Sequence, residues 1–210
     1  MTEDEARDWL HDTLDVPRGT IDMLARFADF LRDEAGQQNL VAASTLDHLW
    51  LRHIVDSAQL LLHVPPFART WVDLGAGAGF PGMVIAALGR HRVTLIEARR
   101  MRIDFLRRAA IRLGIEDHVE IIGARVESVV DRHFDIISAR AFAPLERLLP
   151  LGMRFVAPGT RWLLPKGRNV HAELDAARGS WQGAFEVVPS ITDPEAGILI
   201  AGEIRPRKNR

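Results

Sequence analysis

From Thr70 onward, short runs of β-branched and apolar residues alternate with segments of helical periodicity, and this alternation restricts the possible folds more than any other feature of the sequence. Strands are predicted at WVDLG, RVTLIEA, VEIIGA, FDIISA and TRWLLPKG. Helices are predicted at residues 81–88, 99–113, 144–155 and 169–178. Because strands alternating with helices are joined by right-handed crossovers, we predict a parallel sheet with helices on both faces.

The alternation ends near the C-terminus. AFEVVPSI and GILIAGEIRP are predicted as two further strands, and only the turn-like TDPEAG separates them. Without a helix to form a crossover, these strands are expected to pair antiparallel. The predicted sheet is therefore mostly parallel, with an antiparallel C-terminal strand pair.

The N-terminal third of the chain shows helical periodicity and no strand pattern. Apolar residues recur at helical spacing in IDMLARFADFLRDEAG, with Thr20 as the predicted N-cap. A second helical segment is predicted to begin at Ser44 and to end before Pro65, since proline cannot continue a helix. We predict a small helical N-terminal extension, residues 1–66, followed by an α/β domain, residues 67–210.

Composition excludes several classes of protein. No apolar run approaches the roughly 18 residues needed to span a bilayer, and MTEDEARDW is not typical of a signal peptide, so we expect no membrane association and a cytoplasmic location. The chain has no cysteine, which excludes disulfides, thiolate metal sites and a cysteine nucleophile, and we predict no metal site.

Charge is informative only in its distribution. The 27 basic and 28 acidic residues nearly cancel, so the net charge indicates no particular partner. Residues 90–112 nevertheless carry eight arginines against two acids. This segment is either a basic binding face or an ordinary solvated helix surface, and the sequence does not decide between them.

The loop after the first predicted strand, VDLGAGAGFPG at residues 72–82, contains four glycines. In an open α/β sheet the ligand lies beyond the carboxyl ends of the strands, where this loop is placed. Two patterns overlap in it. GAGFPG matches the G-x-G-x-x-G pattern of dinucleotide-binding proteins, whereas DLGAGAG matches the D-x-G-x-G-x-G pattern of proteins that bind adenosylmethionine.

The chemistry of the flanking residues separates the two patterns. A pyrophosphate needs free N–H groups and no negative charge nearby, but Pro81 removes a donor and Asp73 adds a carboxylate. S-adenosyl-L-methionine carries no phosphate and has an ammonium and a sulfonium group, which Asp73 would attract. We predict that this cofactor is bound by Asp73, Gly75, Gly77 and Gly79.

Acidic residues after the next two strands extend the predicted cofactor site. Glu97 can accept hydrogen bonds from both ribose hydroxyls, a role that both classes of cofactor share. Val126 and Glu127 would reach the adenine edge, although a carboxylate at a helix start explains Glu127 equally well. The antiparallel end of the sheet favours a methyltransferase over a hydride-transfer enzyme.

Motifs and residues that are missing from the chain exclude some classes of methyl-acceptor atom. Where adenine-amine methyltransferases carry [DNS]-P-P-[YFW], the sequence reads ISARAFAP, and methylation of a pyrimidine carbon needs a cysteine. A nitrogen with an in-plane lone pair, such as guanine N7, needs only positioning and no general base. Arg140 and Lys166 are candidates to contact guanine or phosphate, although either could be a surface cation. His53 and Asp56 are predicted neighbours on one helix face, most simply as a buried capping contact or a contact between the helix and the α/β domain.

Motifs spread in order over nearly the whole chain support a more specific hypothesis. They are NLVA, RHIVDS, VDLGAGAGFPG, RRMRIDFL, ARVES, SARAFAP and LPKG. In this combination the sequence resembles the bacterial guanine-N7 methyltransferases of small-subunit ribosomal RNA, also called the glucose-inhibited division protein B family. The resemblance implies a class I methyltransferase (Rossmann-like) domain and methyl transfer from S-adenosylmethionine to guanine N7 in 16S ribosomal RNA.

The resemblance also implies roles for individual residues. Positions that bind the cofactor in the family correspond to Gly75, Phe80, Val126, Glu127 and Arg140, with Glu97 at the ribose. The catalytic motifs correspond to Asn39, His53, Arg140 and Lys166. Contacts to RNA are expected from Arg52, Arg99, Arg100, Arg102 and Arg125.

Other functions remain open from the sequence. The substrate is expected to be small-subunit ribosomal RNA, naked or within a ribosomal particle, and we expect a monomer. A small-molecule methyltransferase whose N-terminal helices form a lid would also carry these features. A nucleotide-binding module without catalysis is the third hypothesis.

Overall fold

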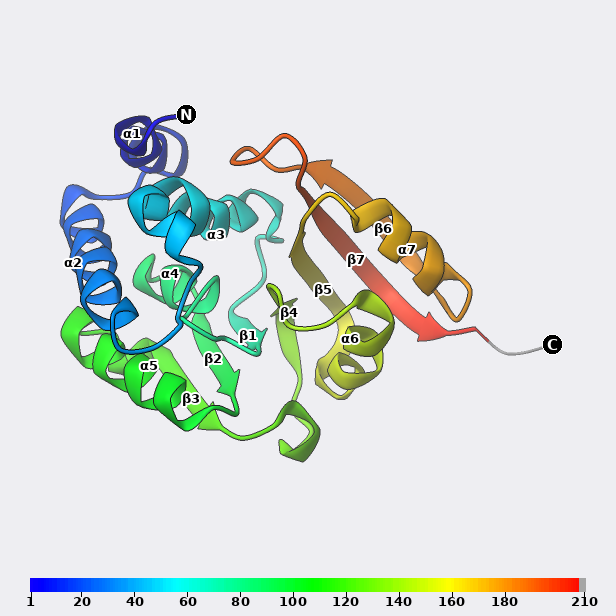
Figure 1. Cartoon of the computed structure of the whole chain (residues 1–210). Helices are drawn as coiled ribbons and strands as arrows, with labels where there is room; N and C mark the ends of the chain where they lie inside the picture. Colours follow the sequence, from blue (N-terminus) through cyan, green and yellow to red (C-terminus); the bar gives the residue numbers. More distant parts are fainter. Residues whose placement is uncertain (208–210) are drawn as a thin grey trace.

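The computed structural model describes residues 1–207 and contains a seven-stranded sheet in the order β3-β2-β1-β4-β5-β7-β6 (Figure 1). The strands are β1 (Thr70–Leu74), β2 (Arg92–Glu97), β3 (Val119–Gly123), β4 (Phe134–Ser138), β5 (Val156–Lys166), β6 (Trp181–Pro189) and β7 (Gly197–Pro206). Strands β1 to β5 pair in parallel, whereas β7 pairs antiparallel with both β5 and β6. The predicted mostly parallel sheet with an antiparallel C-terminal pair is confirmed.

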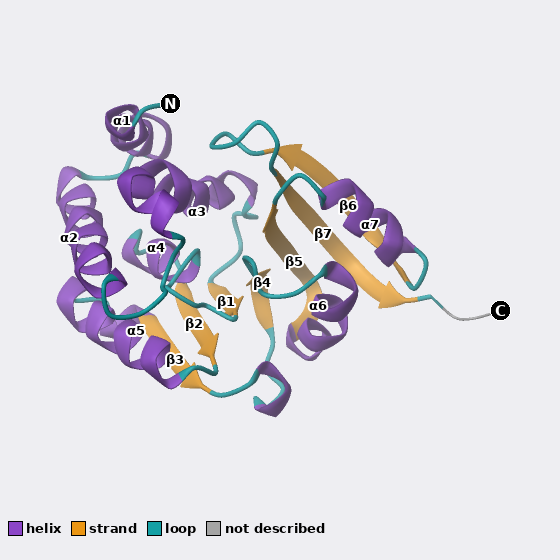
Figure 2. Ribbon diagram, in the orientation of Figure 1, coloured by secondary structure: helices purple, strands orange, loops and turns teal. Residues whose placement is uncertain are grey.

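Helices cover both faces of this sheet, as the alternation predicts (Figure 2). The α-helices of the chain are α1 (Glu3–Leu14), which packs on α2 and not on the sheet, α2 (Arg18–Ala35), α3 (Asp56–Ala58), α4 (Gly82–Ala87), α5 (Arg100–Leu113), α6 (Leu145–Gly152) and α7 (Val170–Arg178). In the described residues no helix is long and apolar enough to cross a bilayer.

Successive strand residues point into two different cores, because side chains alternate across a sheet. Trp71 is buried in the core shared with α2, α4 and α5, whereas its neighbour Val72 is buried in the core shared with α6 and α7. Leu163 and Leu164 divide between the two cores in the same way. The central strands are therefore apolar on both faces, which explains why they appear in the sequence as continuous apolar runs.

The N-terminal helices begin differently from the sequence prediction. The prediction of Thr20 as a helix cap is wrong, because α2 begins at Arg18 with Pro17 as its N-cap residue. Pro17 has φ −62° and an extended ψ of 147°, a conformation that starts the helix three residues earlier than predicted and places Thr20 inside it. The side-chain cap at the start of an N-terminal helix belongs to α1, which begins with a capping box between Thr2 and Glu5.

The second predicted N-terminal helix is present but irregular. It consists of 3-10 turns at Ala43–His48 and Gln59–His63, a π-helical segment at Trp50–Val55 and the short α3 between them. The carboxylate of Glu3 accepts hydrogen bonds from the Trp50 and Leu51 amides, both at 3.0 Å. Helix α1 thereby satisfies two backbone donors where the winding changes. Single π turns often occur at functional sites, because the wider turn redirects side chains.

An ion pair joins the N-terminal helices to the sheet-covering helix α5. Both guanidinium nitrogens of Arg108 donate to the carboxylate of Glu34, each at 2.6 Å. Glu34 is buried, and the hydrogen bonds from Arg108 hold the pKa of its carboxyl below the usual range. The two layers also share one apolar core. The division into an extension of residues 1–66 and a domain of residues 67–210 remains a prediction.

We predict that Glu34→Gln lowers the free energy of unfolding at pH 7 by roughly 1–2 kcal/mol, a value reduced because Arg108 is half exposed. The carboxyl pKa is depressed in the folded state, so the stabilisation is present above the unfolded pKa of glutamate and is lost as pH falls through the folded pKa. Urea unfolding at pH 7 and at decreasing pH measures this, and the variant and the parent should converge in acid.

The exposed pair of Asp29 and Arg32 on the same helix supplies the control. Asp29→Asn should change the unfolding free energy by less than about 0.5 kcal/mol. Equal effects of Glu34→Gln and Asp29→Asn would show that the Glu34 pair does not join the layers.

Candidate active site

The carboxylate of Asp73, at the end of β1, is completely buried beneath the glycine loop. It accepts hydrogen bonds from the Ser138 hydroxyl at 2.8 Å and from the Gly82 amide at 3.0 Å. Burial raises the pKa of Asp73 to about 6, while the two donors oppose the shift. The first amide of α4 is therefore already paired with a carboxylate, at the place where a pyrophosphate would bind.

This arrangement differs from the predicted contact between Asp73 and the cofactor, which stays a prediction. With no exposed surface, Asp73 lines neither of the cavities described below and fixes the shape of the loop instead. The Ser138 hydroxyl also accepts from the Trp71 ring nitrogen at 2.8 Å, so the network joins β1, β4 and α4.

The glycines of the loop have different roles. Gly75, Gly77 and Gly79 have φ values of +69°, +57° and +93°, a region that disfavours any other residue. Only Gly75 lines a cavity, and a Cβ there would overlap the ring of Phe142. A Cβ at Gly79 would meet Met83, so Gly79 permits close packing and does not line either cavity, contrary to expectation.

The loop amides bond within the chain and leave few donors for a phosphate. Gly75 and Ala76 both donate to the Ile96 carbonyl, at 2.9 and 3.0 Å. The Gly77 amide donates to the Glu97 carboxylate at 2.9 Å, although Gly77 itself lines neither cavity. These bonds exclude the loop as a phosphate cradle, which needs free N–H groups.

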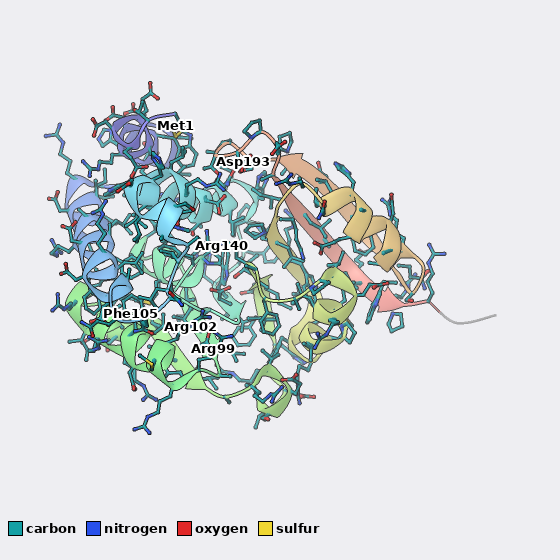
Figure 3. The ribbon with its side chains drawn as sticks, in the orientation of Figure 1. Met1, Arg99, Arg102, Phe105, Arg140 and Asp193 are labelled. Atoms are coloured by element: carbon teal, nitrogen blue, oxygen red, sulfur yellow. The ribbon has the colours of Figure 1, made fainter. Side chains whose placement is uncertain are left out.

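A cavity of about 560 Å³ opens beyond the ends of β1, β2 and β3. Predicted cofactor residues that line it are Gly75, Glu97, Val126 and Glu127. Predicted RNA-binding residues on its wall are Arg99, Arg102 and Arg125. We call it the cofactor cavity. Figure 3 shows Arg99 and Arg102 near the start of α5, on the same side of the molecule as the ends of these strands.

A second cavity of about 700 Å³, here called the acceptor cavity, lies between the N-terminal helical segment and the C-terminal strands. Predicted site residues that line it are Arg52, His53, Arg140 and Lys166. Residues 141–144 line both cavities and form the wall between them. Figure 3 places Arg140 near the centre of the molecule and Asp193 in the loop between β6 and β7.

Three further predicted site residues, besides Asp73, Gly77 and Gly79, lie outside both cavities. Asn39 is exposed beside the acceptor cavity, and its carbonyl accepts from Arg102 at 3.3 Å. Phe80 is 4% exposed, and its ring stacks on His53 with centroids 4.9 Å apart. Its side chain therefore packs behind His53 and does not line the acceptor cavity. Arg100 is exposed on α5.

His53 is held in one neutral tautomer. The Thr45 hydroxyl donates to the Ala42 carbonyl at 2.7 Å, so it accepts a hydrogen bond from His53 Nε2 at 2.8 Å. His53 Nδ1 then accepts from Arg140 Nη2 at 2.9 Å. Burial, with the nearby Arg140 charge, lowers the pKa of His53 to about 3. With both nitrogens engaged, His53 positions Arg140 and is not a proton acceptor at neutral pH.

Asp56 neutralises Arg140 and joins it to the loop between β6 and β7. Its carboxylate accepts from Arg140 at 3.2 Å, from the Thr192 hydroxyl at 2.9 Å and from the side-chain Nε2 of Gln59 at 3.0 Å. Burial lowers the pKa of the Arg140 guanidinium, and the charge of Asp56 opposes that shift. Asp56 therefore lines the cavity as well as making the predicted helix contact.

Most acidic and loop residues of the acceptor cavity carry no signal in the sequence. Asp193 binds Arg52 at 2.7 Å, and Glu173 binds Lys166 at 2.8 Å. These partners lie in a turn and on a helix that carry no motif, so only the fold reveals them. In the described part of the chain, no group of three or more acidic or histidine side chains could hold a metal ion.

Comparison with known proteins identifies the family. The family model described as rRNA small subunit methyltransferase G (GidB) matches residues 20–196. The chain belongs to this family. A relative named ribosomal RNA small subunit methyltransferase G from Rhizorhabdus wittichii is 54% identical, with 99% of this chain and 95% of the relative covered. A relative of the same name from Zymomonas mobilis is 45% identical, with coverage of 100% and 98%.

Solved structures confirm the fold of this family member as that of class I methyltransferases. An O-methyltransferase from Bacillus cereus, in complex with SAH, matches with a TM-score of 0.58 at 18% identity and covers 92% of this chain and 95% of its own. The protein MtNAS in complex with MTA and tNA matches with a TM-score of 0.60 at 16% identity, covering 96% and 81%. At these identities the likeness concerns the fold alone.

We predict that His53 keeps a neutral ring, protonated at Nε2, throughout pH 5–8, because its pKa is about 3. Two-dimensional proton–nitrogen spectra of the imidazole groups measure this, and His53→Gln assigns the signal. The depressed pKa also makes the folded state less stable as pH falls from the unfolded value of 6.5 toward 3, since only the unfolded chain binds the proton there. An imidazolium at pH 6 would contradict the tautomer.

Proposed function

We propose that this protein transfers a methyl group from S-adenosyl-L-methionine to N7 of a guanine in small-subunit (16S) ribosomal RNA. The observation that carries the proposal is the pair of adjoining cavities, one suited to a nucleoside cofactor and the other lined by cations that carboxylates hold in place, with residues 141–144 lining both. Membership of the ribosomal RNA methyltransferase family supports the same substrate.

The residues of the cofactor cavity fit S-adenosylmethionine. Glu97 is 5% exposed at the end of β2, where its carboxylate can accept the ribose hydroxyls, and Val126 offers an apolar contact for adenine. The loop amides are occupied, which suits a ligand without phosphates. When bound, the cofactor supplies an electrophilic methyl group on its sulfonium.

The acceptor cavity provides positioning and hydrogen-bond donors, since Arg52, Arg140 and Lys166 line it and each is paired with a carboxylate. Guanine N7 has a lone pair in the ring plane and no proton to lose, so transfer needs alignment and no general base. His53 is engaged at both nitrogens, in keeping with such a reaction. Arg140 and Lys166 can donate hydrogen bonds to the O6 and N7 edge or to phosphate before the methyl transfers. Asn39 stands at the rim, from which a loop residue can reach bound RNA.

The exposed arginines near the cofactor cavity are proposed to bind the RNA backbone. Arg99, Arg100 and Arg125 are exposed, and Arg125 lies 3.9 Å from Glu127; Arg52 is exposed but paired with Asp193, and Arg102 lies 3.9 Å from Glu97. Contacts with phosphate dominate RNA affinity and weaken with salt. Because one chain holds both cavities, we propose a monomer as the active species, acting in the cytoplasm.

Incubation with methyl-labelled S-adenosylmethionine and unmodified small subunits, followed by mapping of the label, tests the function. We expect label at N7 of one guanine. Arg140→Ala should reduce the rate roughly 100-fold, because it removes the cation that Asp56 and His53 position. Circular dichroism must show that the variant is folded.

Arg92→Ala provides the matched control. Arg92 is an exposed arginine at the start of β2, at the opposite end of the sheet, and its replacement should leave the rate unchanged. Label on another atom, or equal turnover of a small molecule without RNA, would refute the proposed function.

A second experiment tests the arginine surface. We predict that Arg99→Glu combined with Arg100→Glu weakens RNA binding. The negative slope of log affinity against log salt concentration should become less steep by roughly 1–2. Arg107→Glu is the control, since Arg107 is exposed further along α5 and lines neither cavity. Fluorescence titration with ribosomal RNA at several salt concentrations measures the affinity and its salt dependence. Equal losses of affinity in the double variant and in the Arg107→Glu control would exclude a localised contact.

A further inference from the structure

Lys166 and Glu173 form an isolated ion pair on the wall of the acceptor cavity. Lys166 ends β5, and Glu173 lies in the first turn of α7. The Lys166 ammonium donates to Glu173 Oε2 at 2.8 Å and lies 3.4 Å from the Ala143 carbonyl. Ala143 belongs to the wall shared with the cofactor cavity, so the pair extends from this wall toward α7.

The pair keeps unused hydrogen-bonding capacity. Glu173 Oε2 accepts from Lys166 and from the Leu145 amide at 3.1 Å, whereas Glu173 Oε1 accepts from no residue within 1–207. The Lys166 ammonium has three N–H groups, and its two contacts leave one of them. Both residues line the acceptor cavity, and their side chains are 11% and 31% exposed. A free donor therefore lies beside a free acceptor.

A donor beside an acceptor distinguishes guanine from adenine. On guanine the acceptor O6 is followed by the donors N1–H and N2–H₂, whereas adenine presents a donor amine followed by the acceptor N1. Guanine would place O6 on Lys166 and N1–H on Glu173. Adenine would place donor against donor and acceptor against acceptor, and such unpaired polar groups cause strong rejection.

We propose that Lys166 and Glu173 read the O6 and N1 edge of the target guanine, with Glu173 as the residue that determines base specificity. The inference rests on the proposed function. Along the edge of the purine, N7 and N1 lie on opposite sides of O6. With O6 on Lys166 and N1 toward α7, N7 faces the wall shared with the cofactor cavity, which is the orientation that methyl transfer requires.

The alternative is that Glu173 only supports α6, whose first amide it accepts. Glu173→Gln separates the two roles. The glutamine carbonyl can still accept from Leu145, but the side chain loses its charge and presents an amide donor. A support role predicts equal effects on all acceptor bases, whereas a reading role predicts an effect that depends on the base.

The test uses small subunits reconstituted with guanine or 2-aminopurine at the methylated position. 2-Aminopurine keeps N7 but lacks O6 and has an acceptor at N1. We expect Glu173→Gln to lower kcat/KM on guanine by about 10- to 100-fold, the discrimination typical of one well-placed base contact, and to leave the rate on 2-aminopurine nearly unchanged. Glu146→Gln, an exposed glutamate at the start of α6, should match the parent on both substrates.

Equal losses on the two bases, or no loss on guanine, would overturn the reading role. If the parent protein does not methylate guanine N7, the proposed function fails, and a binding measurement then decides the inference separately. Titration of the S-adenosylhomocysteine complex with guanosine and adenosine should show a preference for guanosine that Glu173→Gln removes. Equal binding of the two nucleosides to the parent protein would also overturn it.

Discussion

The acceptor cavity depends on the carboxylate of Asp56, which joins parts of the chain that are far apart in the sequence. One of its oxygens accepts a hydrogen bond from Arg140, which follows the end of β4, and the other accepts one from the Thr192 hydroxyl in the loop before β7. A guanidinium with little solvent around it needs a nearby negative charge, because its lost hydration must be replaced. The irregular N-terminal helix supplies that charge, and His53, three residues earlier, supplies the second contact to Arg140.

The elements that sequence analysis located correctly are those fixed by local patterns. Every predicted strand is present, and GILIAGEIRP coincides with β7, because apolar and β-branched runs determine strands over a few residues. The position of the glycine loop follows from the same rule, since it must succeed β1 in an α/β sheet. Gly75, Glu97 and Val126 meet in one cavity because the carboxyl ends of parallel strands share an edge of the sheet.

What could not be predicted is where a side chain points when two partners compete for it. Asp73 could face a cationic ligand or turn beneath the loop, and the choice is made by Ser138 on a neighbouring strand and by Gly82 at the start of α4. Phe80 is buried because the N-terminal helices cover it, which no pattern near residue 80 reveals. Asp56 meets Thr192 only because folding brings together segments more than a hundred residues apart in the sequence. Glu173 meets Lys166 only because the start of α7 packs beside the end of β5.

The wall between the two cavities has a thermodynamic consequence. Residues 141–144 contact both spaces, and Ala141 has φ +51°, a conformation that costs a residue other than glycine roughly 1 kcal/mol or more. A ligand that shifts this segment therefore changes the shape of the opposite cavity. Linkage makes such coupling reciprocal: whatever factor one ligand imposes on the affinity of the other is returned in equal measure. If a ligand in one cavity displaces residues 141–144, the affinity of the other cavity must change by a factor that applies in both directions.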